Sequence, residues 1–169
     1  MDSSTHLLRL LESSDLKDVE LGLQILSREL NERPSREVFD KAKSFLTHAN
    51  EDIQSEAIWA LCLHWGEKDT LPTLLSLLES RKLSPSLAEM VVRSIGRLGD
   101  EYAELRSKVT KILLKVLRSE GYSPVARGIA YLDCRKIAGY LTVSEYASSP
   151  QDINRLEVDW EWVKTLASD

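Results

Sequence analysis

The fold is decided by residues 84–99, which have the sequence SPSLAEMVVRSIGRLG. A serine followed by a proline suits the start of an α-helix, because the serine hydroxyl can cap free N–H groups and proline lacks an N–H that the first helical position does not need. The apolar residues Leu87, Val91, Ile95 and Leu98 then recur every three or four residues. This spacing predicts a helix that buries one face.

The same pattern recurs along the chain. Asn50 begins a similar stretch with apolar residues at Ile53 and Ala57, and comparable apolar pairs begin at Val19 and Val125. The first positions of these pairs, 19, 53, 87 and 125, are separated by 34, 34 and 38 residues. A period of this length is typical of a solenoid, in which each helical hairpin buries its apolar face only against its neighbours.

Helix-capping and helix-breaking residues predict where the helices begin and end. Proline, serine and asparagine mark the starts, and Gly66, Gly99 and Gly139 fall where C-terminal caps belong. No run alternates between apolar and polar side chains, so we expect an all-α chain. The expected helices are 4–13, 16–31, 35–48, 51–65, 70–82, 85–98, 102–119, 124–139 and 154–167, with 148–150 as a connector.

Residues 84–99 resemble the second helix of a HEAT or HEAT-like (armadillo-type) repeat, whose usual form is Asp-Pro-x-Val-Arg-x-x-Ala-Ala-x-Ala-Leu-Gly-x-Leu-Gly. The chain departs from that form at Ser84, in place of the acidic cap, and at Ala88, in place of the arginine. The resemblance covers roughly residues 4–139. Its period is shorter than the about 40–47 residues of most HEAT and armadillo repeats.

The resemblance implies a short right-handed α-solenoid of about four helical hairpins, closed by a C-terminal capping helix. We expect a single domain over 1–169, with helical repeats over 4–139 and a linker and capping segment over 140–169. The last predicted helix is apolar at Leu156, Trp160, Val163 and Ala167. It can be a cap on the last repeat or a detachable helix with its own partner.

Composition narrows the class of protein. The chain of 169 residues carries 22 Lys and Arg against 27 Asp and Glu, for a formal net charge of −5. It shows neither an apolar run of about 18 residues, as a membrane span needs, nor the pattern of a signal peptide. Its two cysteines form no disulfide framework or zinc motif, which favours a reducing compartment. We expect a cytoplasmic monomer that does not contact a membrane.

The sequence favours a noncatalytic protein without cofactor or metal. His6, His48 and His64 lie on different predicted helices and form no i, i+4 metal-binding pair. By the repeat register, His64 replaces a core leucine and should border the core. Cys62 and Cys134 share one repeat position and are expected to be buried thiols. Nucleophile elbows, phosphate loops and dinucleotide fingerprints are absent from the sequence.

One repeat position predicts a binding surface. The residue six positions after the first apolar residue of each second helix points away from the apolar face, since a helix turns about 100° per residue. These residues are Ile25, Trp59, Arg93 and Tyr131, and Arg97, Arg127 and Arg135 lie near the same direction. In a solenoid they would line the concave groove, where aromatic and arginine side chains can dominate binding. Alternatively, Trp59 and Tyr131 pack between helices or under the terminal segment.

Two classes of function follow from this surface. The predicted partner-binding residues are Trp59, Arg93, Arg97, Arg127, Tyr131 and Arg135. We favour a scaffold or adaptor for a protein or peptide, and an acidic chain of this size would suit a basic toxin as an immunity or antitoxin-type inhibitor.

The alternative function is binding or processing of nucleic acid, as in HEAT-like DNA glycosylases. Residues 106–136 hold eight basic residues against Glu120 and Asp133, and a basic helix face can neutralise phosphates. The basic face of the helix predicted over 102–119 consists of Lys108, Lys111, Lys115 and Arg118. The net charge of −5 argues against this alternative.

Overall fold

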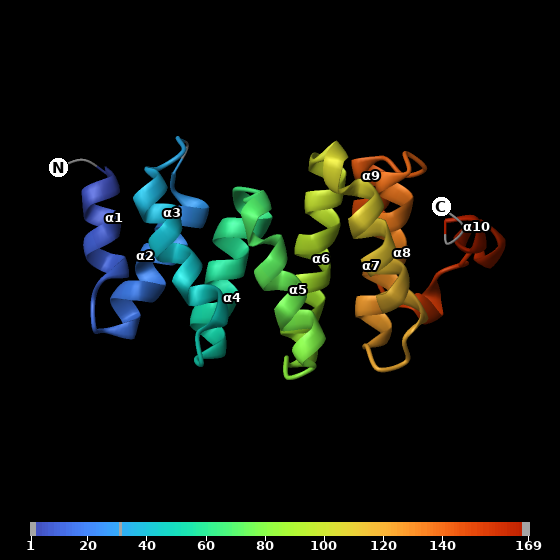
Figure 1. The fold of residues 1–169 in the computed structure, drawn as a ribbon, viewed down its shortest axis with the longest axis horizontal. Helices are drawn as coiled ribbons and strands as arrows, with labels where there is room; N and C mark the ends of the chain where they lie inside the picture. Colours follow the sequence, from blue (N-terminus) through green and yellow to red (C-terminus); the bar gives the residue numbers. More distant parts are fainter. Residues whose placement is uncertain (1–2, 31, 167–169) are drawn as a thin grey trace. The chain divides into compact units, whose positions relative to one another are not determined.

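The computed structural model describes residues 3–30 and 32–166, and these residues form helices and no strand (Figure 1). The α-helices are α1 Ser3–Leu11, α2 Leu16–Arg28, α3 Arg36–Lys43, α4 Glu51–Ile58, α5 Leu71–Ser80, α6 Pro85–Glu101, α7 Arg106–Arg118, α8 Pro124–Ile137, α9 Val143–Ser148 and α10 Trp160–Thr165. Short 3-10 helices occupy Ser44–Thr47, Lys68–Thr70, Ala103–Leu105 and Ile153–Arg155, and a π-helix occupies Trp59–His64.

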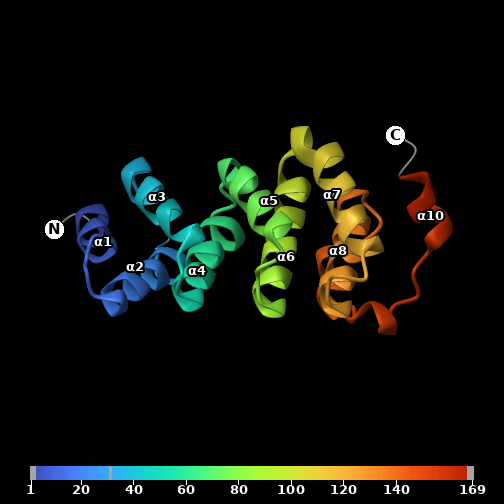
Figure 2. The same cartoon turned by 60° about the horizontal axis from the view of Figure 1, so that its bottom comes forward.

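The chain consists of two compact units, unit 1 over Met1–Leu77 and unit 2 over Leu78–Asp169. In unit 1, α1 packs on α2 and α3, and α2 packs on α4. In unit 2, α6, α7 and α8 pack on one another, and Figure 2 shows them side by side. Each unit therefore places the second helix of one hairpin against the second helix of the next, as in an α-solenoid. The single domain expected over 1–169 stays a prediction.

The repeat register correctly identifies the core. Leu87, Val91, Ile95 and Leu98 are at most 2% exposed. In unit 1, the equivalent Ile53 and Ala57 are also buried, as are Val19 and Leu23. The spacing of apolar residues alone places these side chains, because it follows directly from the helical turn.

The predicted N-caps also form. The Ser84 hydroxyl accepts a hydrogen bond from the backbone N–H of Leu87, and the Asn50 side chain accepts from Asp52 and Ile53. Ser123 caps α8 in the same way, through the N–H of Ala126. Each cap satisfies N–H groups that lack a partner within the helix, which sets where the helix begins.

The three glycines expected to end helices have two different roles. Gly66 and Gly139 have positive φ angles of 63° and 79° and do end helices. Gly99 does not, because α6 continues to Glu101. A Cβ at Gly99 would lie 2.6 Å from Cγ1 of Val109, so this glycine lets α7 approach α6.

The second helix of the second hairpin ends in the π-helix Trp59–His64. Its wider turn carries the hydrogen bond from the N–H of Trp65 to the carbonyl of Ala60, five residues earlier. The extra residue rotates the chain that follows, so His64 is exposed and its predicted place at the core border was wrong. Trp65 points inward instead, and its Nε1 donates to the carbonyl of Leu26 at 2.7 Å.

The terminal segment, residues 140–166, differs most from the prediction. In place of one helix over 154–167 it forms α9, a 3-10 turn, an extended stretch and the six-residue α10. Leu156 lies in the extended stretch, with φ −105° and ψ 140°. Trp160 is 45% exposed, Val163 is buried, and Ala167 lies outside the described residues. The expected apolar stripe along one helix was therefore wrong.

Candidate partner-binding surfaces

The second-helix face is the side of α2, α4, α6 and α8 that points away from the apolar repeat positions. In unit 1, Trp59 is the residue of this face with the largest apolar side chain, and 45% of it is exposed. It is also the first residue of the π-helix, a distortion found often at functional sites. Ile25, one repeat earlier, is half-buried. Unit 1 therefore presents an aromatic side chain to solvent at this repeat position.

Tyr131, at the same repeat position in unit 2, is only 1% exposed. Its hydroxyl accepts a hydrogen bond from the backbone N–H of Asp159 at 3.1 Å, and its ring packs edge-on against Trp162 with centroids 6.1 Å apart. Tyr131 is therefore not an exposed groove residue. It packs under the terminal segment, the alternative placement that the sequence left open.

Arg93 also binds the terminal segment. Its guanidinium donates to the hydroxyl of Tyr146 at 3.3 Å and to Oε1 of Gln151 at 2.7 Å. On α8, Gly128 lies so close to the passing chain that an added Cβ would collide with the backbone carbonyl of Gln151. The second-helix face of unit 2 thus holds a polypeptide segment, and the segment comes from the same chain.

The other predicted arginines have separate neighbours. Arg97 forms an ion pair with Glu101 at 3.4 Å, and Nε of Arg127 donates to the carbonyl of Leu117 at 2.9 Å. That carbonyl lies in the last turn of α7 and lacks a partner within the helix. The guanidinium of Arg135 lies 6.0 Å from the centroid of the Tyr131 ring. Arg135 also lines a pocket with Tyr140, Asp159 and Trp162 of the terminal segment. The structure therefore brings Arg93, Tyr131 and Arg135 to the terminal segment, while Arg127 supports α7.

A buried carboxyl group lies beneath α9, and the sequence did not identify it. Asp133 is 5% exposed, and its Oδ2 has no hydrogen-bond partner among the described residues. Burial raises the pKa of Asp133 to about 7, against the lowering effects of the Tyr146 hydroxyl, Arg93 and Lys136, while Asp100 raises it further. A side chain at Gly96 would collide with this carboxyl group. The close contact between α6 and α8 at Asp133 therefore requires a glycine on α6.

Neither cysteine has the environment of a nucleophile. Cys62 and Cys134 are buried free thiols, as expected. Burial raises the pKa of Cys134 to about 12, so the thiol stays protonated and unreactive. In the described part of the chain, no group of three His, Cys, Asp or Glu side chains could hold a metal ion. The described helices include none that is long and apolar enough to cross a membrane.

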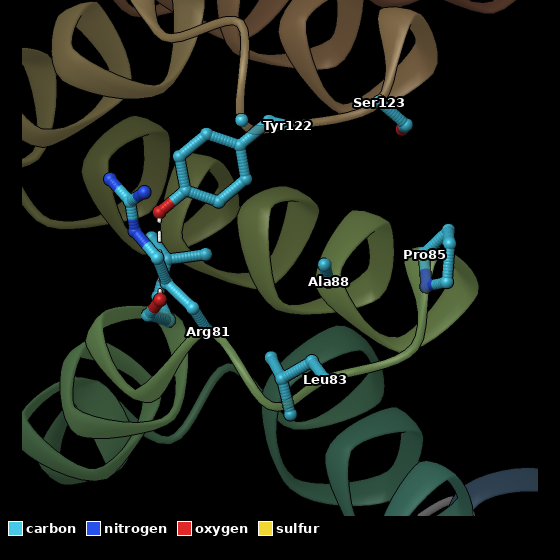
Figure 3. Close-up of a pocket in the computed structure, with 8 residues that line it drawn as sticks. Arg81, Leu83, Pro85, Ala88, Tyr122 and Ser123 are labelled. Atoms are coloured by element: carbon cyan, nitrogen blue, oxygen red, sulfur yellow. Dashed lines mark hydrogen bonds between the residues drawn. The ribbon is translucent and has the colours of Figure 1, made fainter.

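Unit 2 also contains a cavity of about 230 Å³ between the α5–α6 and α7–α8 loops (Figure 3). Its apolar lining is formed by Leu78, Leu83, Pro85 and Ala88. Arg81, Gly121, Tyr122 and Ser123 complete it. The hydroxyl of Tyr122 donates to the carbonyl of Leu78 at 3.5 Å. This site lies at the helix starts, away from the residues that hold the terminal segment.

The hairpins, the repeat period and the second-helix pairs define a helical-repeat protein of the α-solenoid class. A model of the family described as HEAT repeats matches residues 39–132, which is more than half of the chain. The chain belongs to the HEAT-repeat family. Comparison with the curated proteins finds no match, and comparison with the solved structures finds none either.

Proposed function

We propose that this HEAT-repeat protein is a noncatalytic scaffold that binds a protein or peptide on its second-helix face. HEAT repeats commonly serve as protein-interaction scaffolds. The observation that carries the proposal is that this face already binds a polypeptide in unit 2, through Arg93 and Tyr131. In unit 1 the equivalent Trp59 is 45% exposed, so it is available to a segment from another protein.

The chemistry of Trp59 supports this role. A tryptophan supplies a large rigid apolar surface, and such residues carry much of the binding energy at protein interfaces. Burying a large apolar side chain completely contributes about 1.5–3 kcal/mol. The net charge of −5 favours a basic partner through complementary fields. An immunity or antitoxin-type inhibitor of a basic toxin is one protein of this kind.

The test compares two tryptophans with the same exposed fraction. Trp59 and Trp160 are each 45% exposed, and they lie in different units. The full chain and its Trp59→Ala and Trp160→Ala variants are used to capture proteins from a native extract, and the captured partner is then purified and titrated. We expect Trp59→Ala to weaken binding at least about tenfold, which corresponds to about 1.4 kcal/mol, and Trp160→Ala to leave it unchanged. Equal binding by both variants would contradict the proposal.

The alternative, binding of nucleic acid, depends on the basic face of α7. Lys108, Lys111 and Lys115 are exposed there, whereas Arg118 donates to the carbonyl of Val163 at 3.3 Å. Fluorescence anisotropy with labelled single- and double-stranded DNA tests it. We expect no binding at micromolar protein. Binding that weakens steeply between about 50 and 200 mM salt, and that Lys111→Ala reduces, would favour the alternative.

A further inference from the structure

Arg81 has a backbone conformation that its residue type disfavours. It directly follows α5, and its φ of 51° is the only positive φ of a non-glycine residue in the described part of the chain. The position after a helix often takes this left-handed conformation, but glycine is the usual residue there because it has no Cβ to clash. A strained residue that persists at such a position points to a role for its side chain.

Within the described residues, the arginine side chain has no hydrogen-bond or ion-pair partner that explains its presence. Among residues 3–30 and 32–166, no ion pair and no hydrogen bond involves the Arg81 guanidinium. Its Nη1 lies next to Gly121, 3.4 Å from where a Cβ on that glycine would be. Figure 3 shows the guanidinium beside the ring of Tyr122, at one end of the cavity. Arg81 is exposed, so its cation lies where a ligand can reach it.

Away from Arg81 the lining is mainly apolar, and the Ser123 hydroxyl at its far end is bonded to a carboxylate outside the lining. Leu83, Pro85 and Ala88 line it opposite Tyr122 (Figure 3). At the end away from Arg81, the Ser123 hydroxyl donates to Oε1 of Glu89 at 2.6 Å. A second negative charge on the ligand would be repelled there. The cavity therefore suits an apolar group with a single carboxylate at the Arg81 end.

We propose that this cavity binds the C-terminal residue of a partner polypeptide. The terminal carboxylate pairs with Arg81, because guanidinium and carboxylate groups match in geometry and can form two parallel hydrogen bonds. The apolar side chain of that residue occupies the space between Leu83 and Ala88. The volume of about 230 Å³ is below the about 300–1,000 Å³ typical of drug-sized ligands, which favours one residue at a chain end. Capture of a C-terminal carboxylate is a recurring mode of peptide recognition.

This inference rests on the proposed function, since it assigns a second contact to a protein-binding scaffold. Its site lies entirely in unit 2 and does not involve Trp59. The two proposals can therefore fail separately. Loss of the Arg81 contact would leave binding through Trp59 intact, and the Trp59→Ala variant would leave the cavity unchanged.

Arg81→Gly separates binding from folding. Glycine accepts a φ of 51° without strain, so the variant should melt at the same temperature as the wild-type chain or higher. The probes are acetylated pentapeptides that end in leucine, valine or phenylalanine, each as the free acid and as the C-terminal amide. Binding is measured by ligand-observed NMR. We expect a free acid to bind at least tenfold more tightly than its amide, and Arg81→Gly to remove this preference.

Lys82→Gly is the matched control, because Lys82 is an exposed cation next in sequence and does not line the cavity. It should retain the preference for the free acid. Equal binding of acids and amides, no binding of any acid at millimolar concentration, or an unchanged preference in Arg81→Gly would each overturn the proposal. A lower melting temperature of Arg81→Gly would assign Arg81 a structural role and overturn it too. Octanoate that binds more tightly than every peptide would show that the cavity takes a small carboxylate, against the polypeptide proposed here.

Discussion

Trp59 and Tyr131 occupy the same repeat position but have opposite environments. Trp59 in unit 1 is 45% exposed, whereas Tyr131 in unit 2 is 1% exposed. Both point away from the apolar face of their own helix. The difference is that residues of the terminal segment cover Tyr131 through Asp159 and Trp162. The helix register therefore sets the direction of a side chain, and the segment that lies over the face decides whether the side chain is buried.

The largest effect is expected from truncating the covered aromatic residue. Tyr131→Ala should lower the free energy of unfolding by about 3–5 kcal/mol, the range for an aromatic residue truncated in a core. Chemical denaturation followed by circular dichroism measures it. Tyr131→Phe retains the ring and should cost only about 0.5–1.5 kcal/mol, for the lost hydrogen bond to Asp159. A Tyr131→Ala variant as stable as the wild type would show that the terminal segment does not bury this position.

A smaller effect should follow from displacing the segment while the side chains that bind it are kept. Gly128→Ala places a Cβ where the carbonyl of Gln151 lies. We expect it to cost about 1–3 kcal/mol, as in other overpacked sites. Hydrogen exchange should become faster at α9, and unit 2 would then resemble unit 1 in having an open second-helix face.

Gly139→Ala is a useful control for the displacement, because nothing lies within 4 Å of a Cβ at Gly139. Because the φ of Gly139 is 79°, the alanine variant should lose stability through backbone strain. It should do so without opening the contact between Arg93 and Gln151. Protection at α9 that is equally lost in both variants would contradict the steric explanation.

The stability of the folded protein should also depend on pH, through the buried Asp133. The pKa of Asp133 is about 7 in the folded protein and about 3.9 in an unfolded chain, so the folded state binds an extra proton between these values. The resulting stability is complete below about pH 4 and is lost as the pH rises through about 7, with a slope of at most about 1.4 kcal/mol per pH unit. Asp133→Asn removes the titrating carboxyl group and with it this pH dependence. Its melting temperature relative to the wild type should therefore rise from pH 5 to pH 8.

Glu157→Gln provides the comparison for this pH dependence, because Glu157 is an exposed acid of the terminal segment. Its melting temperature should follow that of the wild type across the same range. If the wild type gained stability relative to Asp133→Asn as the pH increased, the raised pKa of Asp133 would be wrong.

Of the two aromatic residues at this repeat position, the exposed Trp59 should give the smaller change in stability when truncated. Trp59→Ala should lower the free energy of unfolding by about 1 kcal/mol, because about half of the side chain is already buried and complete burial of a large apolar side chain contributes about 1.5–3 kcal/mol. Thermal melting beside the partner titration measures both properties in one variant. A loss of several kcal/mol would place Trp59 in the core of unit 1 and remove the contrast with Tyr131.

Local sequence signals predicted much of the fold and little of the candidate site. The caps at Ser84 and Ser123 and the core at Leu87 and Ile95 depend on residues within one or two helical turns, so spacing reveals them. The six-residue α9 is too short to show periodicity, and its capping box between Thr142 and Glu145 is the signal that could have located it. Apolar spacing alone predicts a connector and one helix for this stretch.

The sequence by itself determined that this protein is all-α, where most of its helices begin, and which face of each helix is buried, because these properties arise from contacts between near neighbours. Only the tertiary structure decided that Tyr131 is covered, that burial raises the pKa of Asp133 to about 7 and that Arg81 lies beside a cavity. Each of these depends on groups far apart in the chain, such as Gln151 over Gly128 or Tyr122 beside Arg81. Burial and charge at a binding surface are set by such distant neighbours, and no local pattern records them.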